Sequence, residues 1–120
     1  MIENQNRKQP YDLEERTYFF ALRVREYVKN LPRTISNIEY GRQLIRASGS
    51  QAANYIEANE SLGKKDFKMK IRICRKEVKE SGLWLRLTES SSQYQTEREG
   101  LIKESVELTK IFAAILENSK

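Results

Sequence analysis

The sequence contains no histidine, a single cysteine and only two prolines among its 120 residues. A chain without histidine lacks the commonest general base and the commonest nitrogen ligand for metal ions. One cysteine cannot form an internal disulfide, and scarce proline leaves long helices uninterrupted. We therefore expect a protein with no catalytic residues, no cofactor and no bound metal.

Long apolar runs are also missing. The first sixteen residues, MIENQNRKQPYDLEER, contain no apolar segment of the kind that forms a signal peptide. No later stretch approaches the roughly 18 apolar residues that a membrane-spanning helix needs. We expect a cytoplasmic protein that does not bind membranes.

Two pairs of carboxylates one helical turn apart resemble part of a di-iron site: Glu57 with Glu60, and Glu77 with Glu80. A di-iron bundle also requires Glu-x-x-His motifs, which this chain cannot supply. Ion pairs are the interpretation we favour, with Arg42, Arg46 or Lys76. No glycine-rich phosphate loop occurs, since Gly49 and Gly63 are isolated inside or just after a predicted helix.

What the sequence does contain is helical periodicity, with apolar residues recurring at steps of three and four. The pattern predicts helices at about 12–31, 38–61, 64–90 and 97–118. Four long amphipathic helices with short links are typical of an all-α fold, an antiparallel up-down four-helix bundle. We assign residues 12–118 to this bundle and expect residues 1–11 to form a flexible tail.

The helix ends and the inner faces follow from the same pattern. Asp12 is the expected N-cap of the first helix, and Asn37 or Ser36 that of the second. The glycines at 49 and 82 are expected to weaken or interrupt their helices. The predicted inner faces are Leu13, Thr17, Phe20, Val24, Tyr27 or Val28, and Leu31; Gly41, Ile45, Ser48, Ala52 and Tyr55; Phe67, Ile71, Cys74, Val78, Ser81 and Leu85; and Leu101, Ser105, Leu108, Phe112 and Ile115.

Further apolar residues fall outside these narrow faces. They are Phe19, Leu22, Tyr40, Tyr94, Ile102, Val106 and Ile111. Two interpretations stay open, because such residues either flank a wide core or form a second contact surface for self-association. The second interpretation predicts a homo-oligomer.

The positive charge is concentrated in one segment. Residues 64–80 hold eight basic and three acidic residues, and the rest of the chain holds fourteen of each, so this segment carries the whole net charge of +5. Helical steps place six of its cations on the side away from the apolar face. We call them the basic stripe: Lys65, Lys68, Arg72, Arg75, Lys76 and Lys79.

A basic stripe of this kind has two interpretations. It can neutralise phosphates along a nucleic-acid backbone and release counterions, which gives binding that is strong at low salt and indifferent to sequence. It can equally be a solvated face that keeps the protein soluble. The motifs of dedicated base readers are absent, so the sequence predicts contacts to the phosphates of structured RNA or DNA and no readout of bases.

Several segments carry a family resemblance: QLIRASGSQAANYIEA at 43–58, GKKDF at 63–67, and KE and WLRL at 76–77 and 84–87. With these segments the chain resembles the four helix bundle protein family. That family includes proteins encoded within intervening sequences of bacterial 23S rRNA genes, sometimes labelled ribosomal proteins. Many relatives read NIAEG where this chain reads NYIEA at 54–58.

The resemblance implies an up-down bundle that assembles into a ring-like homopentamer. The family also includes an accessory subunit of diversity-generating retroelements, similar in fold, whose basic surface engages a reverse transcriptase and nucleic acid. Two functional hypotheses follow. In the first the protein binds structured RNA through the basic stripe. In the second it is a scaffold or accessory subunit for a protein partner, such as a reverse transcriptase, that holds the nucleic acid.

Overall fold

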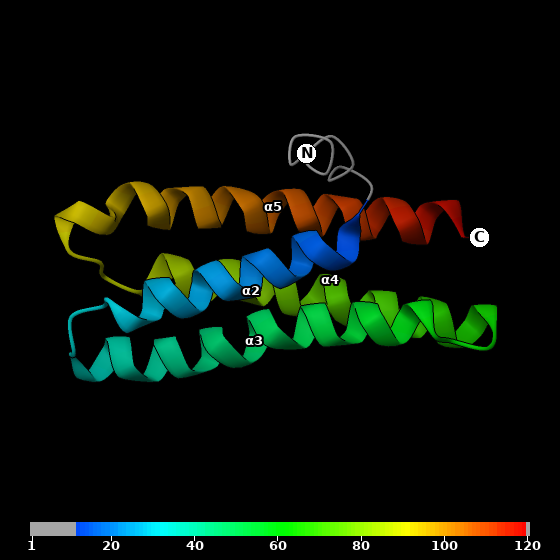
Figure 1. Ribbon diagram of the computed structural model, residues 1–120, viewed down its shortest axis with the longest axis horizontal. Coiled ribbons are helices and arrows are strands. Elements are labelled where there is room, and N and C mark those ends of the chain that lie inside the picture. The colour runs from blue at the N-terminus through cyan, green and yellow to red at the C-terminus, as the bar shows by residue number, and fades with distance from the viewer. Residues whose placement is uncertain (1–11, 120) are drawn as a thin grey trace, which may run out of the picture.

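In a computed structural model that describes residues 12–119, these residues form four α-helices that alternate in direction (Figure 1). They are α2 (Leu13–Lys29), α3 (Ile35–Asn59), α4 (Lys64–Leu87) and α5 (Gln95–Asn118), and a short 3-10 turn, η2 (Ser92–Tyr94), precedes α5. The expected all-α, antiparallel up-down bundle is confirmed. The tail expected at residues 1–11 lies outside the described residues.

The helix boundaries differ from the predicted ones mainly at α3. Asp12 is the N-cap of α2, as expected, and accepts a hydrogen bond from the Glu15 backbone N–H at 3.2 Å. The prediction of Asn37 or Ser36 as the second N-cap is wrong, because the Thr34 hydroxyl accepts from the Asn37 N–H at 3.1 Å. The α3 helix therefore begins at residue 35. The α4 helix ends three residues early, and α5 starts at 95.

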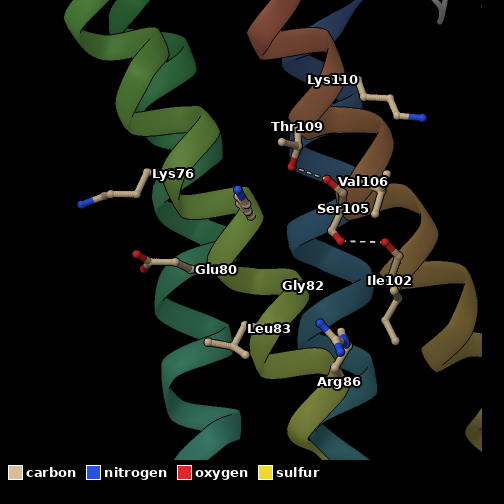
Figure 2. Close-up of a pocket in the computed structure, with 11 residues that line it drawn as sticks. Lys76, Glu80, Gly82, Leu83, Arg86, Ile102, Ser105, Val106, Thr109 and Lys110 are labelled. Atoms are coloured by element: carbon tan, nitrogen blue, oxygen red, sulfur yellow. Dashed lines mark hydrogen bonds between the residues drawn. The ribbon is translucent and has the colours of Figure 1, made fainter.

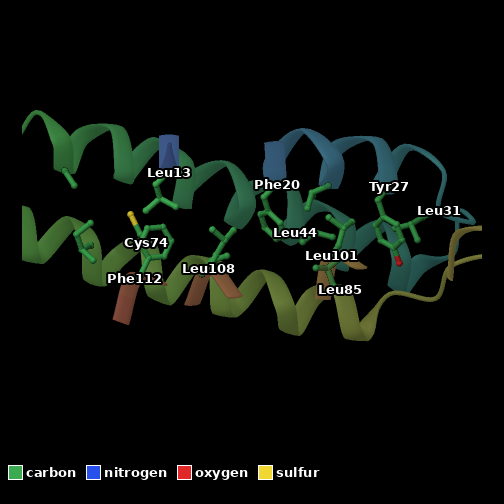
Figure 3. Close-up of a cluster of buried hydrophobic side chains, with 14 residues drawn as sticks. Leu13, Phe20, Tyr27, Leu31, Leu44, Cys74, Leu85, Leu101, Leu108 and Phe112 are labelled. Carbon is green, nitrogen blue, oxygen red and sulfur yellow. The ribbon is translucent and has the colours of Figure 1, made fainter. Parts of the chain in front are cut away.

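The core runs the length of the bundle and receives side chains from all four helices (Figure 3). Buried residues of α2, α4 and α5 follow the predicted inner faces, and Tyr27, rather than the half-buried Val28, completes the α2 face. Among residues 12–119, no helix combines the length and apolar character that a membrane span requires.

The predicted inner face of α3 is partly wrong. Ile45 is 43% exposed, and the buried face is instead Asn37, Gly41, Leu44, Ala47, Ser48, Gln51 and Ala58. Most of these side chains are small or polar, so apolar spacing alone does not single them out. Gln51 is accommodated because its amide Nε2 donates to the carbonyls of Thr17 and Ser48, at 2.9 and 3.0 Å.

Hydrogen bonds between buried polar groups stabilise one end of the bundle. The Asn37 amide Nδ2 donates to the carbonyls of Pro32 and Glu89, and its Oδ1 accepts from the Glu89 N–H, all at 2.9 Å. Nearby, the hydroxyls of Tyr27 and Thr88 form a buried hydrogen bond of 2.8 Å. These contacts hold the loop before α3 and the loop after α4 together.

Cys74 is the small core residue that its position predicts. It is fully buried as a free thiol, and burial raises its pKa to about 12. A thiol that stays protonated and out of contact with solvent is a weak nucleophile. The glycines at 49 and 82 lie within α3 and α4, which continue through them, so the expected interruption at Gly82 is wrong.

The extra apolar residues divide between the two interpretations. Ile102 and Ile111 pack against the core, and Tyr40 stacks on Trp84 with ring centroids 5.9 Å apart. Phe19 and Val106, in contrast, are about half exposed. Four isoleucines on α3 are exposed as well: Ile35, Ile38, Ile45 and Ile56. A wide core therefore explains some of the surplus, and apolar surface remains on α2, α3 and α5.

Candidate nucleic-acid interface

The basic stripe lies along the outer side of α4. Ile71, Cys74 and Val78 are buried on the opposite side of this helix, which fixes its rotation in the bundle. All six stripe residues consequently face away from the core; Lys68 is partly buried and the other five are exposed. A continuous helix from Lys64 to Leu87 holds them at a fixed spacing of about 1.5 Å per residue along its axis.

Most cations of the stripe have no carboxylate partner. Lys76 lies 3.7 Å from Glu77, whereas the other five form no ion pair within 4.0 Å with any of residues 12–119. Off this helix, all four basic residues of α2 and two others are already paired: Arg16, Arg23, Arg25, Lys29, Arg46 and Lys110. The stripe is therefore a surface on which positive charge stays available for a ligand.

Two of the paired cations join α2 to α5. Arg16 Nε lies 2.7 Å from Glu104 Oε2, and Arg23 Nε lies 3.2 Å from Glu97 Oε2. The hydrogen bond to Glu104 raises the pKa of Arg16. These side chains stabilise the contact between the two helices and are not available for a phosphate.

Lys70 belongs to the same segment but not to the stripe. Its Nζ donates to Glu57 Oε1 of α3 at 2.8 Å, and this hydrogen bond raises the pKa of Lys70. The predicted ion pairs are confirmed for Glu77, which is nearly buried and lies 3.5 Å from Arg46. No cluster of three or more potential metal ligands occurs within residues 12–119.

The first half of the stripe surrounds a purely basic hollow. Lys64, Lys65, Lys68 and Arg72 line a space of about 380 Å³ at the start of α4. The N-cap here is Gly63, which supplies no side-chain hydrogen bond to the first turn. Free backbone N–H groups and the positive end of the helix dipole add to the attraction for an anion. Sequence reasoning missed Lys64, although it directly precedes Lys65.

The second half of the stripe borders a different kind of surface. Lys76 and Lys79 are among the residues that line a groove of about 570 Å³ between α4 and α5, together with Arg86 and Lys110. Sequence reasoning missed these last two cations. Arg86 lies two turns after Lys79 and could have been found by extending the stripe, whereas Lys110 comes from α5 and needs the tertiary structure. Arg75 lines neither space.

A protein-family model that matches nearly the whole bundle identifies the family of this chain. A model of the 23S rRNA-intervening sequence protein family matches residues 11–114. The chain belongs to this family. The resemblance drawn from the sequence is thereby confirmed.

A solved structure is similar to this member of the intervening-sequence family. It is a protein of unknown function from the S23 ribosomal protein family of Bacteroides thetaiotaomicron VPI-5482, with a TM-score of 0.70 and 26% sequence identity. The similarity covers 86% of this chain and 96% of that one. No curated protein matches the chain.

Proposed function

We propose that this protein is a non-enzymatic RNA-binding bundle that contacts the phosphates of structured RNA through the basic stripe. The observation that carries the proposal is the placement of charge. The segment that holds the whole net charge of +5 lies in α4, where its six stripe cations face away from the core, and five of these six have no carboxylate partner among the described residues. Unpaired Lys and Arg side chains on one face are the electrostatic footprint of a nucleic-acid binder.

The mode of binding follows from the shape of this face. The stripe runs straight along α4 and contains no aromatic side chain on which a base could stack. Contacts of this kind fix a backbone and do not read bases. Double-helical RNA is recognised mainly through its shape and its phosphates, which suits such a surface.

The experiment that tests this function is ultraviolet cross-linking in the native cell, followed by sequencing of the recovered RNA. We expect enrichment of ribosomal RNA or of another structured transcript. The variant with Arg72, Arg75 and Lys79 changed to Gln should lose that enrichment. Recovery of no RNA above background, or equal recovery with the variant, would overturn the proposal.

We further propose that the bundle acts as a homo-oligomer, with copies of the stripe combined into one positive surface. The exposed isoleucines of α3 support this proposal, because Ile38, Ile45 and Ile56 lie on the same side of the helix. Gly49, between Ile45 and Ile56, has open space around the position of a Cβ atom, so no contact with residues 12–119 requires a glycine there. A ring of five is the assembly that the family resemblance implies.

Light scattering at micromolar concentration tests the assembly. We expect a mass that is a multiple of the 14.1 kDa chain, and a shift toward the monomer when Ile45 and Ile56 are both changed to Gln. Leu62→Gln is the matched control, because this side chain is fully exposed in the loop between α3 and α4. A monomer at every concentration would contradict the proposal.

A further inference from the structure

The groove between α4 and α5 is lined in part by apolar side chains from both helices (Figure 2). Gly82 and Ser105 face one another at its base, where a Cβ atom on Gly82 would lie 2.7 Å from the Ser105 hydroxyl oxygen. Because neither residue has a large side chain, the two helices approach closely and the surface above them is hollow. Leu83, Ile102 and Val106 complete the apolar lining.

The apolar lining is open to solvent. Leu83 is 44% exposed and Val106 is 47% exposed, on the two facing helices. A ligand that covered these side chains would remove apolar surface from water, which favours binding. An RNA backbone cannot use this surface, because a phosphate placed against it would lose its hydration without gaining a hydrogen bond.

The rim of the groove is positively charged on both sides. Lys76, Lys79 and Arg86 border it from α4, and Lys110 borders it from α5. Glu80 is the single acidic residue among the side chains that line it. Lys79 and Arg86 form no ion pair with any of residues 12–119, so two of the four cations are unpaired. A ligand that fits must therefore be apolar along its middle and anionic along its edges.

We propose that the α4–α5 groove binds an acidic amphipathic helix from a partner protein. The lining residues of α4 run from Lys76 to Arg86, which spans about 15 Å at 1.5 Å per residue, or roughly three turns of a bound helix. The apolar face of that helix packs on Leu83 and Val106, and its acidic residues pair with the rim, as in other helix-in-groove complexes. This site goes beyond the proposed RNA function, since the apolar lining residues lie outside the basic stripe.

A synthetic peptide provides the direct test. The probe is a fluorescein-labelled helical peptide of about 18 residues, with Leu at positions i, i+3, i+4 and i+7 and Glu beside them. We expect it to bind with a Kd in the micromolar range. A peptide with Lys in place of Glu, and a scrambled peptide of the same composition, should each bind at least about tenfold more weakly.

Two variants separate this site from the RNA surface. Leu83→Gln combined with Val106→Gln should weaken peptide binding at least about tenfold and leave RNA binding unchanged, because it removes apolar area without altering charge. Lys65→Gln, Lys68→Gln and Arg72→Gln together should weaken RNA binding and leave peptide affinity within about threefold. Since Leu83 and Val106 are half exposed, the midpoint of thermal unfolding of the Leu83 and Val106 variant should be close to that of the unsubstituted protein.

Several results would overturn the proposal. Equal binding of the scrambled peptide, or no effect of the Leu83 and Val106 substitutions, would remove the groove as the site. Loss of RNA binding in that variant would assign the groove to RNA, and dissociation of the oligomer would assign it to a second copy of the chain.

Failure of RNA binding in every variant, with peptide binding intact, would refute the RNA function alone.

Discussion

Changing Arg72, Arg75 and Lys79 together to Gln is expected to weaken binding of a structured RNA hairpin by about 10- to 100-fold at low salt, through lost phosphate contacts. All three side chains are exposed on α4, and none pairs with a carboxylate among residues 12–119. Glutamine keeps a good helix propensity and removes only the charge. Fluorescence anisotropy with a labelled hairpin measures the effect directly.

A matched control distinguishes the stripe from the total charge. Arg33, Arg42 and Lys103 are also exposed and form no ion pair with the described residues, but they lie off α4. Changing these three to Gln removes the same net charge and should weaken RNA binding by less than about threefold, since only long-range screened attraction is lost. An equal loss in both variants would mean that RNA responds to the overall charge of the protein and not to the stripe.

Asn37→Ala is expected to lower the free energy of unfolding by about 2–4 kcal/mol, through loss of buried hydrogen bonds. The Asn37 amide makes three hydrogen bonds of 2.9 Å, two as donor and one as acceptor. Without them the carbonyl of Pro32 and both backbone groups of Glu89 lose their side-chain partner at one end of the bundle. Urea denaturation followed by circular dichroism measures the change.

Asn54→Ala is the matched control for this substitution. The Asn54 amide is half-buried and donates only to Ser50, one turn earlier in the same helix. Its loss should cost less than about 1 kcal/mol, because water can replace the partner and alanine favours the helix. If the two variants unfold at the same urea concentration, the contacts of Asn37 do not hold the loops together.

The predictions from sequence succeeded where one apolar face is unambiguous. On α4, Ile71, Cys74 and Val78 recur at steps of three and four, and all are fully buried. On α3 the same reasoning assigned Ile45 to the core, because isoleucine occurs on the outer side of this helix too. The true face depends on Asn37 and Gln51, whose burial requires hydrogen bonds to distant carbonyls. Spacing along one helix carries no information about such partners.

The candidate site, too, was predictable from the sequence only in part. The stripe lies on a single helix, so its exposure follows from the burial of the opposite face. The role of Lys70 depends on Glu57 of α3, and the groove depends on Lys110 and Val106 of α5. Contacts between helices far apart in the sequence come from packing, which helical periodicity does not specify.

The salt dependence of RNA affinity tests the central claim most directly. The logarithm of the association constant should fall linearly with the logarithm of the salt concentration, because each neutralised phosphate releases counterions. In the variant with Arg72, Arg75 and Lys79 changed to Gln, the slope should be smaller by roughly two to three, about one for each lost phosphate contact. A slope identical to that of the unsubstituted protein would contradict phosphate binding by the basic stripe.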